Sequence, residues 1–330
     1  MSLNLALIGA GTIAKAHLAA IEALKGQVAV TAVIDPNPVA REGAVKRTGA
    51  KGFESADAFF ASKPRELAQA ALVCTPPSAR ITIVGRALQS GLAVLAETPI
   101  AHRLADAQAL LGMSYQYRGV VAAVAYCHRF TPAMVEMKKR ADTGELGTVL
   151  RFEATFASWR PTLEKTWVSD PAISGGGALI DTGSHGLDLY RYLVGDGAIA
   201  SATVHELWKG RGETSATVQL LPAKTAKHTK ATGLIQVGWQ EPSRFTVRLT
   251  GTKISLAYDY DEPETLVVTP SEGEATAVKV ASHEGRYERQ LQAFASLIGS
   301  KAPEVRPANF EDGSQVAKLV DEATRARVVI

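Results

Sequence analysis

Two polar side chains in the stretch GGGALIDTGSHGLD (175–188) have the types and spacing for proton transfer. Asp181 and His185 are four residues apart, so on a helix both side chains project from one face. An imidazole can take a hydroxyl proton near neutral pH, and a carboxylate can orient the imidazole or the substrate. Oxidation of a secondary alcohol needs such a base while a hydride leaves for an acceptor. We predict that Asp181 and His185 are catalytic and bind substrate.

Two other interpretations of this stretch stay open. One is structural: a glycine-rich approach to a helix whose first turn is capped by an aspartate. The other is a metal site formed by Asp181, His185 and Asp188. We expect no metal, because further ligands are missing nearby in the sequence.

A second polar group ends the apolar run LAVLAETPIA (92–101). Five apolar residues are followed by Glu97, Thr98 and Pro99, which fits a strand buried on both faces and ending at a crevice. Thr98 is therefore a further candidate for the catalytic site and the cofactor site, and Glu97 for the cofactor site. A threonine can exchange hydrogen bonds but cannot titrate near neutrality.

The elements that would position these groups alternate along the first third of the chain. Apolar runs at 3–9, 28–35, 70–77, 92–97 and 120–127 are separated by helical patterns at 12–26, 36–49, 78–91 and 103–119. This order predicts a doubly wound parallel sheet, whose ligands bind beyond the carboxyl ends of the strands. We therefore predict a nucleotide-binding Rossmann domain over 1–125.

The pattern changes after a helix at 131–147. Longer, alternating strands are predicted at 151–159, 214–221, 232–240, 243–251 and 252–260, with helices at 175–195, 287–299 and 311–326. In 243–251, Phe245, Val247 and Leu249 share one face. We predict an α+β domain over 126–330 with a large, mostly antiparallel open sheet. Its last helices could pack back on the first domain.

The first strand leads into GAGTIAKAH (9–17), a G-x-G-x-x-A pattern that is typical of a dinucleotide site. Gly9 permits the tight turn, Gly11 lets backbone amides approach a pyrophosphate, and the helix that follows offers its positive end. Asp35, at the end of the second strand, can bind a ribose diol and repel a 2′-phosphate. NAD is therefore favoured over NADP. His17 is expected on the helix surface.

The third strand ends in Thr75, Pro76 and Pro77, which is either a stiff turn or part of the same crevice. The predicted cofactor-binding residues are Gly9, Ala10, Gly11, Thr12, Ile13, Asp35, Thr75, Pro76, Pro77, Glu97, Thr98 and Arg129.

The bulk composition is that of an ordinary globular protein. The 330 residues are 46% hydrophobic and 21% charged, with a net charge of +3, which argues against nucleic acid as a partner. No apolar run reaches the roughly 20 residues that cross a membrane. Two cysteines without metal spacing suggest a reducing compartment. We expect a cytoplasmic protein that does not bind membranes.

The chain resembles the glucose-fructose oxidoreductase / inositol dehydrogenase / rhizopine-catabolism (Gfo/Idh/MocA) oxidoreductases. The resemblance covers nearly the whole chain, through GAGTIAKAH, VIDPNP, CTPPSAR, LAETPIA, HRFTPAMVEMKKRADTGELG, SGGGALIDTGSHGLDLYRYLVG and EDGSQVAKLVDEATRA in the family's order. It implies an NAD(P)-dependent oxidoreductase acting on a sugar, inositol or related polyhydroxy substrate. It also implies a homodimer or homotetramer that associates through the second domain's sheet.

Three positions depart from the family pattern. LAETPIA resembles the family's Glu-Lys-Pro corner beside the nicotinamide, where the lysine takes part in proton transfer, but the lysine is replaced by Thr98. Cys127 stands where the family often has asparagine, and Arg80 where it frequently has histidine. Arg129 matches. The departures favour a site adapted to a different substrate. They also leave open a catalytically silent NAD-binding sensor or regulator of sugar metabolism, with an NAD-dependent glycosidase as a third alternative.

Candidate substrate contacts lie between the first long strand and the glycine run. Trp159, Arg160 and Trp167 combine aromatic faces with a guanidinium, which suits a sugar or a sugar acid. Trp159 could equally be an anchor in the hydrophobic core.

Overall fold

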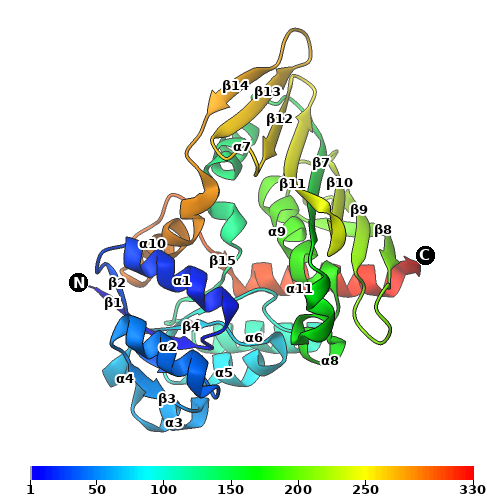
Figure 1. Cartoon of the computed structure of the whole chain (residues 1–330). Helices are drawn as coiled ribbons and strands as arrows, with labels where there is room; N and C mark the ends of the chain where they lie inside the picture. Colours follow the sequence, from blue (N-terminus) through cyan, green and yellow to red (C-terminus); the bar gives the residue numbers. More distant parts are fainter. Residues whose placement is uncertain (1) are drawn as a thin grey trace. The chain divides into compact units, whose positions relative to one another are not determined.

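The computed structural model describes residues 2–330. Its contacts divide the chain into two compact units. The first contains the residues up to Cys127 together with Tyr287–Ser314, and the second contains His128–Arg286 and Gln315–Ile330. Figure 1 shows the elements of both. Each unit is described by itself below.

The first unit is built on a seven-stranded sheet in the order β15-β6-β5-β4-β1-β2-β3. Its strands are β1 (Leu3–Ile8), β2 (Val28–Ile34), β3 (Lys51–Phe53), β4 (Ala70–Val73), β5 (Ala93–Ala96), β6 (Ala122–Val124) and β15 (Ala308–Asn309). All neighbours are parallel except β15, which runs antiparallel to β6. The predicted parallel doubly wound sheet is confirmed.

Helices connect these strands. They are α1 (Thr12–Ala23), α2 (Pro38–Thr48), α3 (Ala56–Ala61), α4 (Pro64–Leu67), α5 (Pro77–Gln89) and α6 (Leu104–Gln116), followed by the short helix η1 (Cys127–Phe130). Every residue of β4 and β5 is buried, as expected for central parallel strands covered on both faces. Leu291 and Phe294 of α10 (Arg286–Ile298) belong to the same hydrophobic core, although they are far along the chain.

The second unit is built on a nine-stranded sheet in the order β14-β13-β12-β11-β7-β10-β9-β8-β16. Its strands are β7 (Val149–Trp159), β8 (Gly197–His205), β9 (Ser215–Pro222), β10 (Thr232–Gly238), β11 (Gln240–Gly251), β12 (Ile254–Asp259), β13 (Thr265–Pro270), β14 (Thr276–Lys279) and β16 (Arg327–Val329). The sheet is antiparallel apart from the pairs β10–β7 and β16–β8. The predicted, mostly antiparallel sheet is confirmed.

The other elements of this unit are α7 (Pro132–Asp142), η2 (Pro161–Lys165), η3 (Trp167–Ser169), α8 (Pro171–Ser174), η4 (Leu179–Gly183), α9 (Ser184–Leu193) and η5 (His283–Gly285). Helix α11 (Phe310–Ala326) begins in the first unit and ends in the second.

Helix α9 packs closely on β10 and β7. A Cβ atom on Gly186 would lie 2.8 Å from the side chain of Ile235 in β10, so a larger residue would push the helix off the sheet. The covered face of the sheet presents Phe152 and Phe156, while Glu153 and Thr155 point to the opposite face. Phe245, Val247 and Leu249 alternate with Thr246 and Arg248 as predicted. Among residues 2–330, no helix combines the length and apolar character that a membrane crossing requires.

Candidate functional site

The turn after β1 has the geometry of a dinucleotide-binding loop. Gly9 has φ +93°, and a Cβ there would lie 2.8 Å from the backbone of Cys74, so both conformation and space require glycine. At Gly11 a Cβ would meet no atom within 4 Å. Gly11 precedes α1, whose first turn receives no side-chain cap from it. The loop therefore has open space beside Gly11 at the N-terminus of α1, where an anionic ligand can bind.

Other predicted cofactor contacts lie in the same loop. Ala10 is buried, Thr12 begins α1, and Ile13 packs against the core. Asp35 is fixed at the end of β2, because its Oδ2 accepts the N–H of Ala10 at 2.7 Å and its Oδ1 accepts the N–H of Asn37 at 2.8 Å.

The end of β4 contributes a hydroxyl. The Oγ1 atom of Thr75 is buried and has no hydrogen-bond partner among the described residues. Pro76 and Pro77 begin α5 here. A buried hydroxyl without a partner is rare in folded proteins and indicates a missing ligand or water. The open space at Gly11, the carboxylate of Asp35 and the hydroxyl of Thr75 together fit a dinucleotide.

Glu97 follows β5 and faces inward. Its Oε1 lies 2.5 Å from Nε2 of His17, and its Oε2 accepts the N–H of Thr98 at 3.1 Å. The hydrogen bond to His17 and the charges of His17 and Arg80 lower the pKa of Glu97 despite its burial. The expectation that His17 lies on the helix surface is wrong: it is fully buried, because α1 turns this face toward the 97–99 corner. The bond between Thr98 and Pro99 is cis.

In the second unit, Asp181 lies in a π-helical turn, η4, that leads into α9. Such turns are rare and often occur at functional sites. The Oδ2 of Asp181 accepts the indole N–H of Trp239 at 3.2 Å and lies 3.8 Å from Nη1 of Arg160. Burial raises the pKa of Asp181, against the opposing effects of Arg160 and Trp239.

The glycine run before this turn allows two backbone segments to pack closely against each other. A Cβ on Gly177 would collide with the backbone of Glu213. The buried carboxylate of Glu213 accepts the N–H groups of Gly177 and Leu179, each at 3.0 Å. Glu213 thus holds the start of the turn that carries Asp181. Neither Glu213 nor Trp239 stands out in the sequence, because each lies in an unremarkable strand-end segment far from residue 181.

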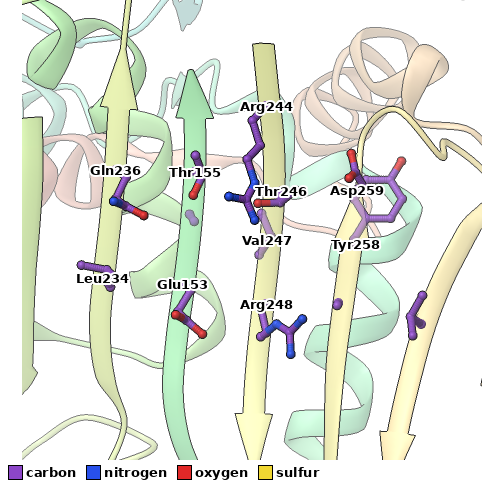
Figure 2. Close-up of a pocket in the computed structure, with 13 residues that line it drawn as sticks. Glu153, Thr155, Leu234, Gln236, Arg244, Thr246, Val247, Arg248, Tyr258 and Asp259 are labelled. Carbon is purple, nitrogen blue, oxygen red and sulfur yellow. The ribbon is translucent and has the colours of Figure 1, made fainter. Parts of the chain in front are cut away.

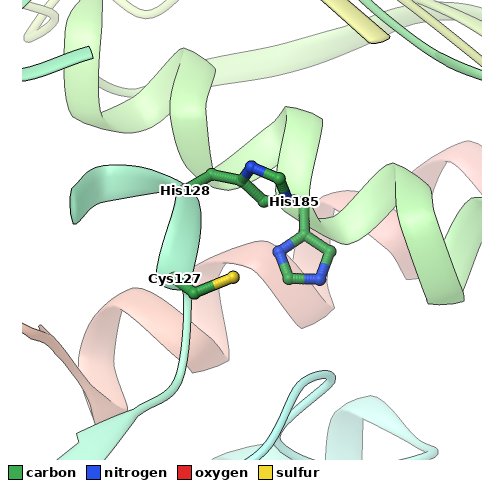
Figure 3. Close-up of side chains that lie close together, drawn as sticks. All are labelled: Cys127, His128 and His185. Carbon is green, nitrogen blue, oxygen red and sulfur yellow. The ribbon is translucent and has the colours of Figure 1, made fainter. Parts of the chain in front are cut away.

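His185 lies on α9 beside a second imidazole. Its ring meets that of His128 edge to face with centroids 4.9 Å apart. His128 is stacked on Phe156, and its Nδ1 lies 2.6 Å from the hydroxyl of Tyr260. Burial, with smaller electrostatic contributions from His185, Arg286 and His283, holds the pKa of His128 well below its usual range. Figure 3 shows both imidazoles with Cys127, the residue that precedes His128 in the chain.

Arg129 and Asp188 form a buried, two-pronged ion pair. Nε of Arg129 donates to Oδ2 of Asp188 at 2.8 Å, and Nη2 donates to Oδ1 at 2.5 Å. The guanidinium also lies over the ring of Tyr192. The carboxylate of Asp188 is therefore engaged by Arg129, which weakens the alternative metal site of Asp181, His185 and Asp188.

The predicted substrate residues are exposed on the same unit. Trp159 and Trp167 are 64% and 43% exposed, so Trp159 is not an anchor in the core. Arg160 forms an ion pair with Asp181.

A hollow of about 450 Å³ lies elsewhere, on the open face of the sheet. Figure 2 shows the polar side chains that line it, among them Glu153, Thr155, Gln236, Arg244 and Arg248. It contains none of the predicted catalytic residues.

Comparisons with known proteins agree with this geometry. Residues 3–126 match the family described as "Oxidoreductase family, NAD-binding Rossmann fold", and residues 134–257 match the GFO/IDH/MocA C-terminal domain. Inositol 2-dehydrogenase of Rhizobium meliloti is 24% identical over 339 aligned residues, which cover 99% of this chain and 97% of that protein. Levoglucosan dehydrogenase of Pseudarthrobacter phenanthrenivorans is 29% identical over 213 residues, or 62% of this chain and 54% of that protein.

A solved structure of levoglucosan dehydrogenase in complex with NADH has a TM-score of 0.87 and 22% identity to this chain. The superposition covers 99% of this chain and 97% of that one, and it shows that the fold is shared. Because the two family matches together span most of the chain, this protein belongs to the GFO/IDH/MocA family of oxidoreductases, with an NAD-binding Rossmann fold in its first unit.

Proposed function

We propose that this protein is an NAD-dependent dehydrogenase that acts on a secondary hydroxyl of a sugar, inositol or related polyhydroxy compound, with His185 as the acid-base residue. The observation that carries this proposal is the arrangement of Asp181 and His185 on successive turns of one helical segment, with Asp181 tied to Trp239 and Arg160. Bound NAD would supply the hydride acceptor. The relatives named as inositol and levoglucosan dehydrogenases support the substrate class.

The protein's own residues would manage the proton. His185 takes the hydroxyl proton as the carbon is oxidised. His128 stays neutral, because burial lowers its pKa, and so puts no positive charge beside His185 when that residue is protonated. Asp181 accepts a hydrogen bond from a substrate hydroxyl. A threonine at position 98 can exchange hydrogen bonds but supplies no charge.

Arg160 is expected to give the proposed substrate site a preference for compounds that carry a carboxylate. Its side chain is 46% exposed and lies 3.8 Å from Asp181, so a carboxylate on the substrate could share the guanidinium. The exposed rings of Trp159 and Trp167 suit the apolar faces of a sugar. The panel of candidate substrates therefore contains three groups of compounds: sugars, sugar acids and inositols.

The direct test is NADH formation, followed by absorbance, with this panel and NAD. Turnover with at least one compound is expected, and it should be lost in His185→Asn. Tight binding of NADH without turnover on any compound would instead favour a sensor or regulator. The observation that favours a sensor or regulator is that Thr98 stands where the family has a lysine.

We also propose that the protein self-associates through the open face of the nine-stranded sheet. The hollow there carries acidic and basic side chains together, including Glu153 and Arg248, so the face can be complementary to itself. Thr155→Arg would add a charge to this face. Sedimentation of the native protein is expected to show a species larger than the 35.0 kDa chain, and Thr155→Arg should dissociate it. Both cysteines are buried, and the small number of cysteines fits a reducing, cytoplasmic location.

A further inference from the structure

The helical segment that carries Asp181 and His185 begins without a capping side chain of its own. It runs through η4 and α9, and the residues before it are glycines and Ala178, whose side chains cannot accept a hydrogen bond. The first N–H groups of a helix have no partner within the helix, and a Ser, Thr, Asp or Asn beside them usually supplies one. In this protein the partner comes from another part of the chain.

That partner is Glu213, which is only 6% exposed. Its Oε1 accepts the N–H groups of Gly177 and Leu179, each at 3.0 Å. Its backbone carbonyl accepts the N–H of Ala178, which lies between them, at 2.8 Å. Three successive N–H groups at the start of the helix are therefore bound by one residue that is distant in the sequence.

Backbone hydrogen bonds connect Glu213 to the other residues that hold Asp181. Just beyond the paired part of β9 and β10, the carbonyl of Thr214 accepts the N–H of Trp239 at 2.8 Å. The carbonyl of Trp239 in turn accepts the N–H of Arg160 at 2.7 Å. The segments that carry Glu213, Trp239 and Arg160 are thus fixed relative to one another before any of their side chains reaches Asp181.

Asp181 is held at both its backbone and its side chain. Its backbone N–H donates to the carbonyl of Gly177 at 3.1 Å, so its backbone follows the start of the helix, which Glu213 binds. Its carboxylate accepts the indole N–H of Trp239 at 3.2 Å. Trp239 is fully buried and stacked on Trp208, with ring centroids 5.8 Å apart. A shift of the helix start would therefore move Asp181 while the indole stays in place.

We propose that Glu213 is a positioning residue of the substrate site, which sets where the helix begins and so places the carboxylate of Asp181 against Trp239 and Arg160. The inference rests on the proposed function for its kinetic readout, because there Asp181 accepts a hydrogen bond from a substrate hydroxyl. A misplacement of about 1 Å in such a site can cost about 10²-fold in rate.

The kinetic test compares Glu213→Ala with Glu213→Gln, which keeps an oxygen that can accept both N–H groups. We expect kcat/KM to fall roughly tenfold or more in Glu213→Ala, to stay within about threefold in Glu213→Gln, and the NADH dissociation constant to change less than about twofold in both. In an Asp181→Ala background, Glu213→Ala should change kcat/KM less than about twofold, since its effect passes through Asp181. An equal loss in both backgrounds would overturn the proposal.

Glu206 provides the matched control. It is an exposed glutamate that pairs with Arg327 at 3.4 Å. Burial raises the pKa of Glu213, and Arg327 is among the groups that oppose this shift, so both glutamates are close to the same cation. Glu206→Ala removes a carboxylate from these surroundings without touching the helix start. It should leave kcat/KM within about twofold of the native value.

Hydrogen exchange of the Trp239 indole N–H gives a readout that needs no turnover. The chain has four tryptophans, and Trp239→Phe identifies the signal of Trp239 in a ¹⁵N spectrum. In Glu213→Ala this N–H should exchange roughly tenfold faster, because its acceptor on Asp181 moves away, while Glu213→Gln and Glu206→Ala should leave its rate unchanged. An unchanged rate in Glu213→Ala would overturn the proposal, whatever the activity.

The two readouts separate this inference from the proposed function. Faster exchange in Glu213→Ala, with no compound of the panel oxidised by the native protein, would refute the dehydrogenase function and support positioning by Glu213. If Glu213→Ala does not fold, Glu213→Asp takes its place, since its carboxylate is one methylene further from the helix start. Its exchange rate and kcat/KM should change in the same directions by smaller factors, and no change in either would overturn the proposal.

Discussion

The guanidinium of Arg129 holds the carboxylate of Asp188 with two parallel hydrogen bonds, and the two side chains are 7% and 1% exposed. The pair joins η1 to α9, the helix that carries His185. It therefore fixes His185 indirectly, through the packing of its helix.

Breaking this pair from one side should destabilise the protein. Arg129→Met leaves the carboxylate of Asp188 buried without its partner, which costs about 3–5 kcal/mol of unfolding free energy. Urea denaturation measures the change. The exposed pair of Arg325 and Asp321 is the control, since Arg325→Met should cost about 1 kcal/mol or less. If the two substitutions had equal effects, Arg129→Met would not leave a buried charge on Asp188 without a partner, which would contradict this account.

His128 should make the stability of the protein depend on pH. The pKa of His128 in the folded protein lies well below the 6.5 of the free side chain. Between these two pKa values, the unfolded chain therefore binds a proton at His128 that the folded protein does not bind. The free energy of unfolding is then expected to fall as the pH drops through about 6.5, until the lower folded-state pKa is reached. His102 and His228 are shifted in the same direction and contribute to the same slope.

The contribution of His128 is isolated by comparison with His128→Gln. Urea unfolding between pH 7.5 and 5.5 should show a shallower loss of stability in the variant. Glu97 does not interfere in this range, because its stabilising ionisation is lost only below the ordinary carboxyl pKa of 4.5. An unchanged slope would mean that the folded protein does not hold His128 in its neutral form.

Asp35 should determine the choice between NAD and NADP. Asp35→Asn keeps an oxygen for the N–H of Ala10 but removes the negative charge. We expect NADH affinity to fall roughly tenfold, as a charged hydrogen bond to the ribose is lost, and NADPH affinity to rise. Fluorescence titration with both nucleotides measures the ratio. Asp57→Asn, at an exposed side chain of α3, should leave the ratio as it is.

The local patterns of the sequence predicted both kinds of sheet, but only part of their strands. The β-α alternation of the first third predicted the parallel sheet, and the alternation in 243–251 predicted which residues of β11 share a face, because strand periodicity depends only on near neighbours. Strands β3, β8, β13, β14, β15 and β16 were missed. Strands β15 and β16 have two and three residues, and each forms through a partner far along the chain.

The candidate site was only partly predictable. Gly9, Asp35, Asp181 and His185 carry their own local signatures. By contrast, the partners Trp239 and Tyr260 reach the site through tertiary packing, for which no local signature exists. His17 was misplaced for the same reason: the helical pattern of α1 could not reveal that a buried carboxylate from residue 97 would meet it. The roles of these residues in catalysis stay predictions.

The most direct test of the account is the turnover number of His185→Asn with NAD and the best substrate of the panel, measured beside its NADH dissociation constant. We predict a loss of turnover of about 10²–10⁴-fold, as for removal of a general base, with NADH affinity changed less than about twofold. Turnover within about threefold of the native protein would contradict the assignment of His185 as the proton acceptor.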